Sequence, residues 1–356
     1  MTDDNHHSAT DIVQSIREGR TTPSAVMAAH LDRIAAREAV VGAFIHLDAD
    51  RAMQRARAAD NRPATGALHG VPFAIKDIID TDDMPAAWGS DSLAGRRPAG
   101  NAACVQAFLD AGAIPLGKTV TTEFAYFKPG KTANPHRLSH TPGGSSSGSA
   151  AAVADLMAPL AFGSQTAASL IRPAAYCGVA AFKPTTGAFD LSGVMALSPS
   201  LDTLGILARD PRDFVLARCV LTGTPMPAPL DFSGRLPRIC LMRGPHWQDG
   251  SIEMREACRR AMAALAACGA DTGEIAHPPL FADLTQAHKD VMGYEAARSR
   301  ADVYDSHRPM ISTQFAELIE TGKRVTDTRY HAALAMRDRA NAMVEVMLGD
   351  CDALLA

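Results

Sequence analysis

Short apolar runs bounded by glycine or proline recur along this chain and alternate with helix-like segments. Most runs are apolar at successive positions rather than at every second position, which is typical of strands that are covered on both faces. Strands that alternate with helices indicate an α/β fold. We therefore predict a central sheet with helices on both faces. The runs are Val71–Ile75, Ala113–Leu116, Leu160–Phe162, Val179–Phe182 and Ile239–Met242.

The first sixty residues are predicted to be helical. Thr10 is the expected N-cap of a helix that ends at Glu18, because apolar residues recur there at helical spacing. Thr22-Pro23 places a capping side chain before a proline at the first helical position, so a second helix should run toward Glu38. Ala49–Asp60 repeats the helical pattern.

The remaining helices are expected after the first strands. Asn101–Gly112 separates two apolar runs, and Ser251–Cys268 is alanine-rich and amphipathic. Leu284–Met347 is typical of two or three long helices. The sequence closes on Ala353–Ala356, which resembles the start of a buried strand. We therefore expect the chain to be truncated at its C-terminus.

Charge and cysteine content exclude several classes of protein. The net charge is only -4, and Lys and Arg are scattered, so a nucleic-acid surface is not expected. The seven cysteines are dispersed and form no C-x-x-C motif, which argues against a disulfide framework or a structural zinc site. The polar start of the chain lacks the regions of a signal peptide, and no run of about 18 apolar residues could span a bilayer. We predict a cytoplasmic protein.

A glycine- and serine-rich segment, Pro142–Ala150, admits three interpretations. Such composition is usual in a flexible linker. A linker should join polar boundaries, however, and Ala150–Ala154 follows at once with good helix-forming sequence. The segment is therefore typical of a tight loop that leads into a helix N-terminus, where free amide groups stabilise negative charge.

The second interpretation is a nucleophile elbow, because Gly144–Gly148 satisfies G-x-S-x-G with Ser146 at its centre. That motif requires a buried strand directly before it, whereas Asn134–Pro142 is polar and interrupted by proline. It also requires an aspartate and then a histidine downstream, and no spacing favours any of the available histidines. We disfavour the elbow. The histidines are His246, His277, His288, His307 and His331.

The third interpretation comes from two neighbouring segments. Gly70–Lys76 places a lysine at the end of an apolar strand. A simpler explanation of this lysine is that the strand ends at the surface and the ammonium group is solvated. Leu160–Pro173 is a strand followed by small residues that include Ser169. Small residues let a substrate approach the backbone, and consecutive amide groups in such a turn can form an oxyanion hole.

Together these segments resemble the amidase-signature family, most densely between Gly70 and Asp210. Lys76, Ser145 and Ser169 fall on the family's lysine, cis-serine and nucleophilic serine. The resemblance implies a mixed central sheet covered by helices on both faces, with the C-terminal part of that sheet missing here. It implies residues 1–62 as an N-terminal helical segment packed on the core and residues 63–356 as the truncated α/β domain.

The resemblance also implies a mechanism, the hydrolysis of a carboxylic amide through a serine acyl-enzyme. Ser169 is expected to attack, and Ser145, on a cis peptide, to relay the proton to Lys76. A lysine serves as a base only when neutral, so its pKa must fall from about 10.4 toward neutrality. Backbone amides of Thr166, Ala167 and Ala168 are expected to bind the oxyanion. No metal or cofactor is required.

The chain departs from the family around the nucleophile. It has Gln165–Ser169 as Gln-Thr-Ala-Ala-Ser where the family often has Asp-Thr-Gly-Gly-Ser, and Arg172 stands one position later than usual. Alanine penalises a positive φ by about 1–2 kcal/mol. These features indicate a Gln-Thr-Ala-x-Ser subgroup. Two alternatives stay open: a glutaminase-type A subunit of an amidotransferase, and a catalytically impaired truncated homologue.

The expected partner is a small-molecule amide, with no nucleic acid and no membrane, and a homodimer stays open. Met84, Trp88 and Tyr126 are candidates to line an apolar or aromatic acyl pocket, and core packing explains them about as well.

Overall fold

The computed structural model describes residues 4–228, 231 and 234–356. By its internal contacts the chain forms two compact units. The first comprises Met1–Met226 with Glu295–Glu320, and the second comprises Pro227–Tyr294 with Thr321–Ala356. The division after residue 62 that the sequence suggested stays a prediction.

A six-stranded mixed sheet organises the first unit, in the order β1-β3-β2-β4-β6-β5. Central β2 runs parallel to both of its neighbours, whereas β1, β5 and β6 are paired antiparallel. The predicted α/β class with a mixed sheet is therefore confirmed. The strands are β1 Phe44–Leu47, β2 Pro72–Lys76, β3 Ile114–Thr119, β4 Leu160–Gln165, β5 Ala180–Phe182 and β6 Thr203–Ala208.

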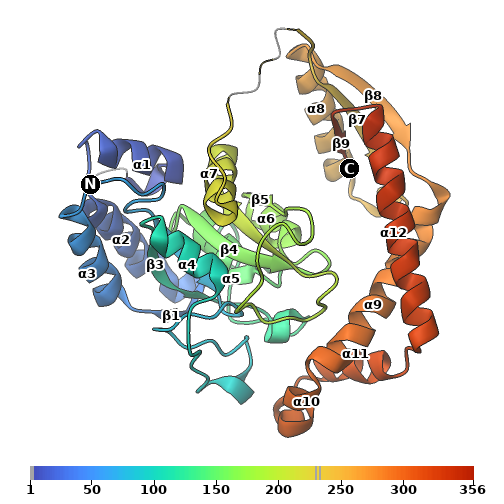
Figure 1. Ribbon diagram of the computed structural model, residues 1–356, viewed down its shortest axis with the longest axis horizontal. Coiled ribbons are helices and arrows are strands. Elements are labelled where there is room, and N and C mark those ends of the chain that lie inside the picture. Colours follow the sequence, from blue (N-terminus) through green and yellow to red (C-terminus); the bar gives the residue numbers. More distant parts are fainter. Residues whose placement is uncertain (1–3, 229–230, 232–233) are drawn as a thin grey trace. The chain divides into compact units, whose positions relative to one another are not determined.

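Helices lie on both faces of this sheet (Figure 1). Ala74 and Ala161 share one apolar core with residues of α2 and α5. Phe73 and Phe162 come from the same two strands but meet the ring of Phe108 in α4, with ring centroids 5.2 and 4.4 Å from it. The alternation along β2 and β4 thus separates two cores. The helices are α1 Ala9–Arg17, α2 Pro23–Val41, α3 Ala49–Asp60, α4 Ala103–Asp110, α5 Ser147–Ala154, α6 Ile171–Cys177 and α7 Pro211–Thr222.

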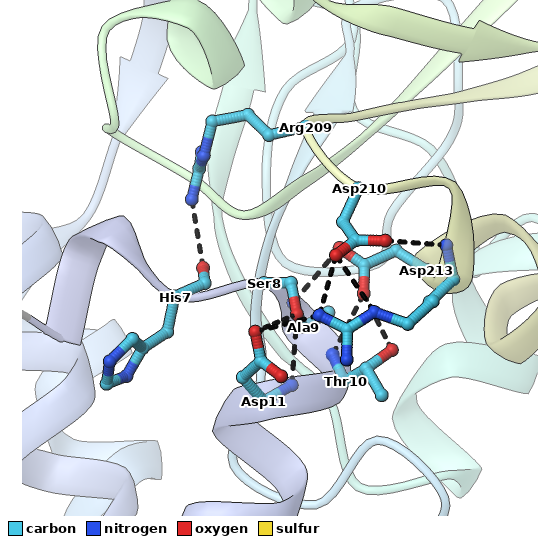
Figure 2. A network of polar contacts seen from close by, with 9 residues as sticks. His7, Ser8, Ala9, Thr10, Asp11, Arg209, Asp210 and Asp213 are labelled. Atoms are coloured by element: carbon cyan, nitrogen blue, oxygen red, sulfur yellow. Dashed lines mark hydrogen bonds and ion pairs between the residues drawn. The ribbon is translucent and has the colours of Figure 1, made fainter. Parts of the chain in front are cut away.

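The start of α1 differs from the sequence prediction. Ser8, rather than Thr10, is the N-cap, and its hydroxyl accepts a hydrogen bond from the amide of Asp11. Thr10 instead donates its amide and its hydroxyl to the buried carboxylate of Asp213 in α7 (Figure 2). Arg209 adds a bond to the His7 carbonyl. The helix is therefore capped two residues earlier than predicted, and the Thr10 hydroxyl makes a tertiary contact instead.

Elsewhere the predicted elements are close to those observed. Thr22 caps α2 as expected, through the amide of Ala25, and α3 has the predicted bounds. The sequence interpretation missed the strands β1 and β6, the helices α6 and α7, and the strand Asp271–Ala276. Short 3-10 helices occur at Asp4–His6 (η1), Asp91–Leu93 (η2), Glu123–Ala125 (η3), Trp247–Asp249 (η4), Pro279–Asp283 (η5) and Arg308–Met310 (η6).

The second unit contains a parallel three-stranded sheet in the order β8-β7-β9, with helix α8. Leu284–Met347 contains three long helices, within the predicted two or three, and one short helix, Ala301–His307. The expected terminal strand is present, but Ala353 is exposed and its neighbours half-buried, so the prediction of a buried strand is wrong. The remaining elements of the chain are β7 Arg238–Arg243, α8 Ile252–Ala267, β8 Asp271–Ala276, α9 Leu284–Ser299, α10 Ala301–His307, α11 Thr313–Lys323, α12 Asp327–Gly349 and β9 Ala353–Leu355. Of these, the end of α9, all of α10 and most of α11 belong to the first unit.

Among the described residues, no helix combines the length and the apolar character that crossing a bilayer requires.

Candidate active site

Lys76 ends the central strand β2 and is completely buried. Its Nζ donates hydrogen bonds to Ser145 Oγ at 2.7 Å and to Ser164 Oγ at 2.8 Å. Burial lowers the pKa of Lys76 to about 7, against the attraction of the Asp202 carboxylate, which raises it. A substantial fraction of this amine is therefore neutral near pH 7, as a general base must be.

Ser145 lies in the loop between β3 and α5, and the Gly144–Ser145 peptide bond is cis. Its carbonyl accepts a hydrogen bond from the amide of Thr122, at 3.3 Å. The next residue, Ser146, donates its amide to the carbonyl of Ser169 at 3.0 Å. The serine that touches Lys76 and the predicted nucleophile thus belong to two loops joined by a backbone hydrogen bond.

Ser169 follows β4 and precedes α6, and it is largely buried. Gln165 shapes this loop, because its side-chain oxygen accepts the amides of Leu170 and Ile171 at 3.0 Å each. Arg172 Nε and Nη2 donate to the carbonyl of Gly144 at 2.9 and 2.6 Å. The displaced arginine therefore holds the nucleophile segment against the loop that carries Ser145. Within the described residues, the hydroxyl of Ser169 makes no hydrogen bond.

The segment before Ser169 presents free backbone donors. Within the part of the chain that the structure describes, the amides of Thr166, Ala167 and Ala168 donate to no other protein group. Ala167 is exposed and its two neighbours are half-buried. None of these residues has a positive φ, so the expected conformational penalty of alanine does not arise here. The loop is therefore unstrained although alanine stands where the family often has glycine, and its backbone amides are available.

Two further residues belong to this constellation and were missed from the sequence. Ser164, near the end of β4, is the second acceptor of the Lys76 ammonium. Asp202 accepts the hydroxyl of Thr166, and its other oxygen accepts the amides of Leu197 and Ser198 at 2.7 and 2.9 Å. The signal for Ser164 was available: it is a hydroxyl in an otherwise apolar strand that leads to the nucleophile.

Ser146 does not have the environment of a nucleophile elbow. Its side chain is completely buried, and its Oγ exchanges hydrogen bonds of 3.3 Å with the backbone carbonyl and amide of Ser164. The segment before it is irregular, with an isolated bridge between Asn134 and Arg137. An elbow serine must be exposed after a strand, so the elbow interpretation fails on both counts.

The three residues suggested for an acyl pocket have different surroundings. Met84 is buried in the core. The ring of Tyr126 lies 4.7 Å from that of Phe127 and 6.3 Å from that of Phe315. Trp88 is half-buried, and the guanidinium groups of Arg96 and Arg300 lie over its ring. In residues 4–228, 231 and 234–356, no group of three or more histidine, cysteine, aspartate or glutamate residues is placed to hold a metal ion.

Comparison with known proteins identifies the family to which this chain belongs. A sequence profile of the family described as Amidase matches residues 25–356. A crystal structure of an amidase superposes with a TM-score of 0.88 at 29% identity, over 98% of this chain and 81% of that one. The peptide amidase of Stenotrophomonas maltophilia superposes with a TM-score of 0.78 at 28% identity, over 92% of this chain and 77% of that enzyme.

Curated relatives carry a related name. The A subunit of the glutamyl-tRNA(Gln) amidotransferase of Acidothermus cellulolyticus (strain ATCC 43068 / DSM 8971 / 11B) is 38% identical over an alignment of 305 positions. The alignment covers 78% of this chain and 60% of that relative. The protein of the same name in Salinispora arenicola (strain CNS-205) is 41% identical over an alignment of 246 positions, and this alignment covers 65% of this chain and 50% of the relative. The chain thus spans between half and three fifths of the length of these two relatives.

Proposed function

This chain belongs to the amidase family, and from that premise we propose that it hydrolyses a linear carboxylic amide to a carboxylate and ammonia or an amine. The reaction proceeds through an acyl-enzyme on Ser169. One observation carries the proposal: the buried amine of Lys76, with a pKa of about 7, donates to Ser145 Oγ at 2.7 Å. A serine hydroxyl needs such a base to become a nucleophile.

The proton moves along the three residues in both half-reactions. Ser169 Oγ attacks the amide carbon while its proton passes to Ser145 Oγ, and the Ser145 proton passes to the neutral amine of Lys76. The ammonium then returns a proton through Ser145 to the departing nitrogen, and the carbon–nitrogen bond breaks. Water repeats the sequence on the ester and releases the carboxylate, with Ser169 restored.

The negative charge that develops on the carbonyl oxygen needs fixed donors. In our proposal the free amides of Thr166, Ala167 and Ala168, with that of Ser169, supply them. Their position is set by the hydrogen bond from Thr166 to Asp202. Preorganised amides of this kind are among the largest contributions to acyl-transfer catalysis.

A fluorophosphonate probe tests the assignment of the nucleophile directly. We expect the probe to add covalently to wild-type protein and to Ser146→Ala, and to leave Ser169→Ala unlabelled, as read from the intact mass. Labelling that persists in Ser169→Ala and is lost in Ser146→Ala would overturn the proposal. An unlabelled wild type with a cooperative thermal unfolding transition would favour the catalytically impaired homologue instead.

A second candidate function follows from the relatives that are named as A subunits of an amidotransferase, which reach 41% identity. A glutaminase-type subunit would need a partner protein to receive the ammonia. Co-purification of the chain from its native source, followed by mass spectrometry, distinguishes the two. A stoichiometric partner together with hydrolysis restricted to glutamine would favour this second function. We place either function in the cytoplasm, on the dispersed, unpaired cysteines of the sequence.

A further inference from the structure

Among the described residues, the guanidinium of Arg300 has neither a hydrogen-bond partner nor an ion-pair partner. Arg300 lies between α9 and α10 and is half-buried, and burial lowers its pKa. Its Nε is buried without a hydrogen bond, and within the described residues the side chain forms no ion pair. Buried polar atoms are normally hydrogen-bonded, so the unsatisfied Nε of a partly buried cation points to a ligand that is bound during function.

Arg96, which lies over the same indole ring, differs from Arg300 because it is paired with a carboxylate. Arg96 and Arg300 both lie over the ring of Trp88, with their Cζ atoms 4.3 and 5.1 Å from its centroid. Arg96 also binds the carboxylate of Asp80 through two hydrogen bonds of 2.7 and 2.8 Å. The charge of Arg96 is therefore neutralised locally, whereas that of Arg300 is not.

Asp202 is not the missing ion-pair partner of Arg300. Its charge attracts Arg300, but the two are not an ion pair, and its oxygens already accept from the side chain of Thr166 and from two backbone amides. The attraction does place Arg300 in the same electrostatic neighbourhood as Lys76, whose pKa Asp202 also raises.

One side of the Arg300 site is built from the loops around Ser145. The amide of Trp88 donates to the carbonyl of Asp77, the residue directly after Lys76, at 3.3 Å. Gly89 packs so closely that a Cβ there would lie 2.8 Å from the carbonyl of Thr122. The amide of Thr122 in turn donates to the carbonyl of Ser145. The indole under Arg300 is thus fixed to backbone that touches the catalytic serine.

The other side is tied to the loop that supports the oxyanion segment. Ser299, next to Arg300, donates its hydroxyl to the carbonyl of Leu197 at 2.9 Å. Glu295 accepts the hydroxyl of Ser198 at 2.7 Å and the amide of Ser200 at 3.0 Å. These contacts hold Arg300 at the loop that leads into Asp202.

The indole supplies a second unused donor. Trp88 Nε1 is buried without a hydrogen-bond partner, and Trp88 has a positive φ of 56°. Strained, unsatisfied groups persist where a function requires them. One unpaired cation beside one neutral donor fits a monoanion with two oxygens. A phosphate dianion would require a second free cation, and Arg96 is already bound to Asp80.

We propose that Arg300, with Trp88, binds a carboxylate of the substrate, so that the substrate is an amide carrying a second, anionic group away from the scissile bond. A monoamide of a short dicarboxylic acid has this chemistry. The inference rests on the proposed amide hydrolysis, since it names the substrate class of that site. Arg300 sets specificity and takes no part in proton transfer.

A matched pair of substrates tests this directly. Succinamate and butanamide have chains of the same length, and only succinamate carries the carboxylate. We expect wild type to favour succinamate in kcat/KM, and Arg300→Gln to reduce that preference about 10- to 100-fold, mainly through KM. Arg300→Lys should recover part of the preference for succinamate. Trp88→Phe should reduce this preference less than Arg300→Gln does. Arg97→Gln, at an exposed neighbouring arginine, should keep the preference.

Ligand binding separates failure of this inference from failure of the proposed function. In the Ser169→Ala background, succinate should bind more tightly than butyrate by calorimetry, and adding Arg300→Gln should abolish the difference. Equal binding of the two acids in Ser169→Ala would overturn the inference, even if wild type hydrolyses amides. Preferential succinate binding by a protein that hydrolyses neither substrate would sustain the inferred carboxylate site while the proposed hydrolysis fails.

Discussion

Lys76 Nζ donates a hydrogen bond of 2.7 Å to Ser145 Oγ, and both residues are almost entirely excluded from solvent. The contact joins the end of β2 to the loop before α5, two segments that lie far apart in the sequence. Since burial brings the pKa of Lys76 to about 7, a neutral amine and an ammonium are both accessible to this pair near neutral pH. The same contact can therefore accept a proton and later return it.

The pKa of Lys76 predicts how activity depends on pH. The base acts only when neutral, so kcat/KM should rise as pH increases through about 7 and become level above it. A lysine with an ordinary pKa of about 10.4 would place the rise about three pH units higher. Initial rates from pH 5 to 10, with protein stability checked at each value, measure this. A rise centred near pH 10 would contradict the role of Lys76.

Asp202 should tune that pH dependence. Its negative charge raises the pKa of Lys76, so Asp202→Asn should shift the rising limb to lower pH. The hydrogen bond from Thr166 to Asp202 should also weaken, and we expect kcat to fall about 10-fold at the plateau. Asp190→Asn, which removes an exposed carboxylate, serves as the control and should leave the limb in place. An upward shift in Asp202→Asn would be incompatible with this electrostatic role.

Ser164 should affect both the position and the protonation of Lys76. The hydroxyl stabilises the ammonium more than the neutral amine, so Ser164→Ala should lower the pKa of Lys76 further. We expect the pH limb to move down and kcat to fall about 10-fold because the amine loses one of its two fixed contacts. Ser164→Thr keeps a hydroxyl and should restore both. A loss of kcat with an unchanged limb would indicate a purely structural role.

The catalytic candidates could be predicted from the sequence because the segments that carry them together resemble the amidase-signature family. Lys76 ends an apolar strand, Ser145 lies among glycines before a helix, and Ser169 follows a run of small residues. Asp202 has no comparable local signature, and the polar position of Ser164 in a largely apolar strand does not indicate which residue it contacts. Their roles come from hydrogen bonds that the sheet creates between segments far apart in the chain, and spacing along the sequence does not reveal these.

Contacts between distant segments also limited the prediction of the fold. Continuous apolar runs predicted β2 and β4, whereas β1 is short and contains a histidine, and β6 is interrupted by Gly205. The cap of α1 was misassigned because the hydroxyl of Thr10 binds Asp213, which lies 203 residues away. Local propensity identifies where a helix forms, but competition from distant side chains decides how it begins.

Asp213 should be important for stability rather than for catalysis. Its buried carboxylate accepts the amides of Ala9 and Thr10 and the Thr10 hydroxyl, at 2.8 to 3.0 Å (Figure 2). Asp213→Ala leaves these donors without their acceptor, and we expect the free energy of unfolding to fall by about 2–4 kcal/mol. Asp213→Asn keeps one acceptor oxygen and should cost less. Urea denaturation measures both, with Asp110→Ala at an exposed carboxylate as the neutral control.

Gly148 should be the least replaceable glycine of the serine-rich segment. It lies in the first turn of α5, where a Cβ would stand 2.2 Å from the carbonyl oxygen of Ala43 and 2.4 Å from the amide of Val120. Both are backbone atoms of a packed sheet edge and cannot rotate away, so α5 would have to move. We expect Gly148→Ala to reduce the free energy of unfolding by about 3 kcal/mol or more.

The same displacement should reach the active site, because α5 begins two residues after Ser145. Any folded Gly148→Ala protein should therefore react more slowly with the fluorophosphonate probe at Ser169. Gly100→Ala is the matched control, since no atom lies within 4 Å of a Cβ at that position, and it should change stability by less than about 0.5 kcal/mol. Equal stability and equal labelling rates of the two variants would show that α5 is not held against the sheet as closely as these distances require.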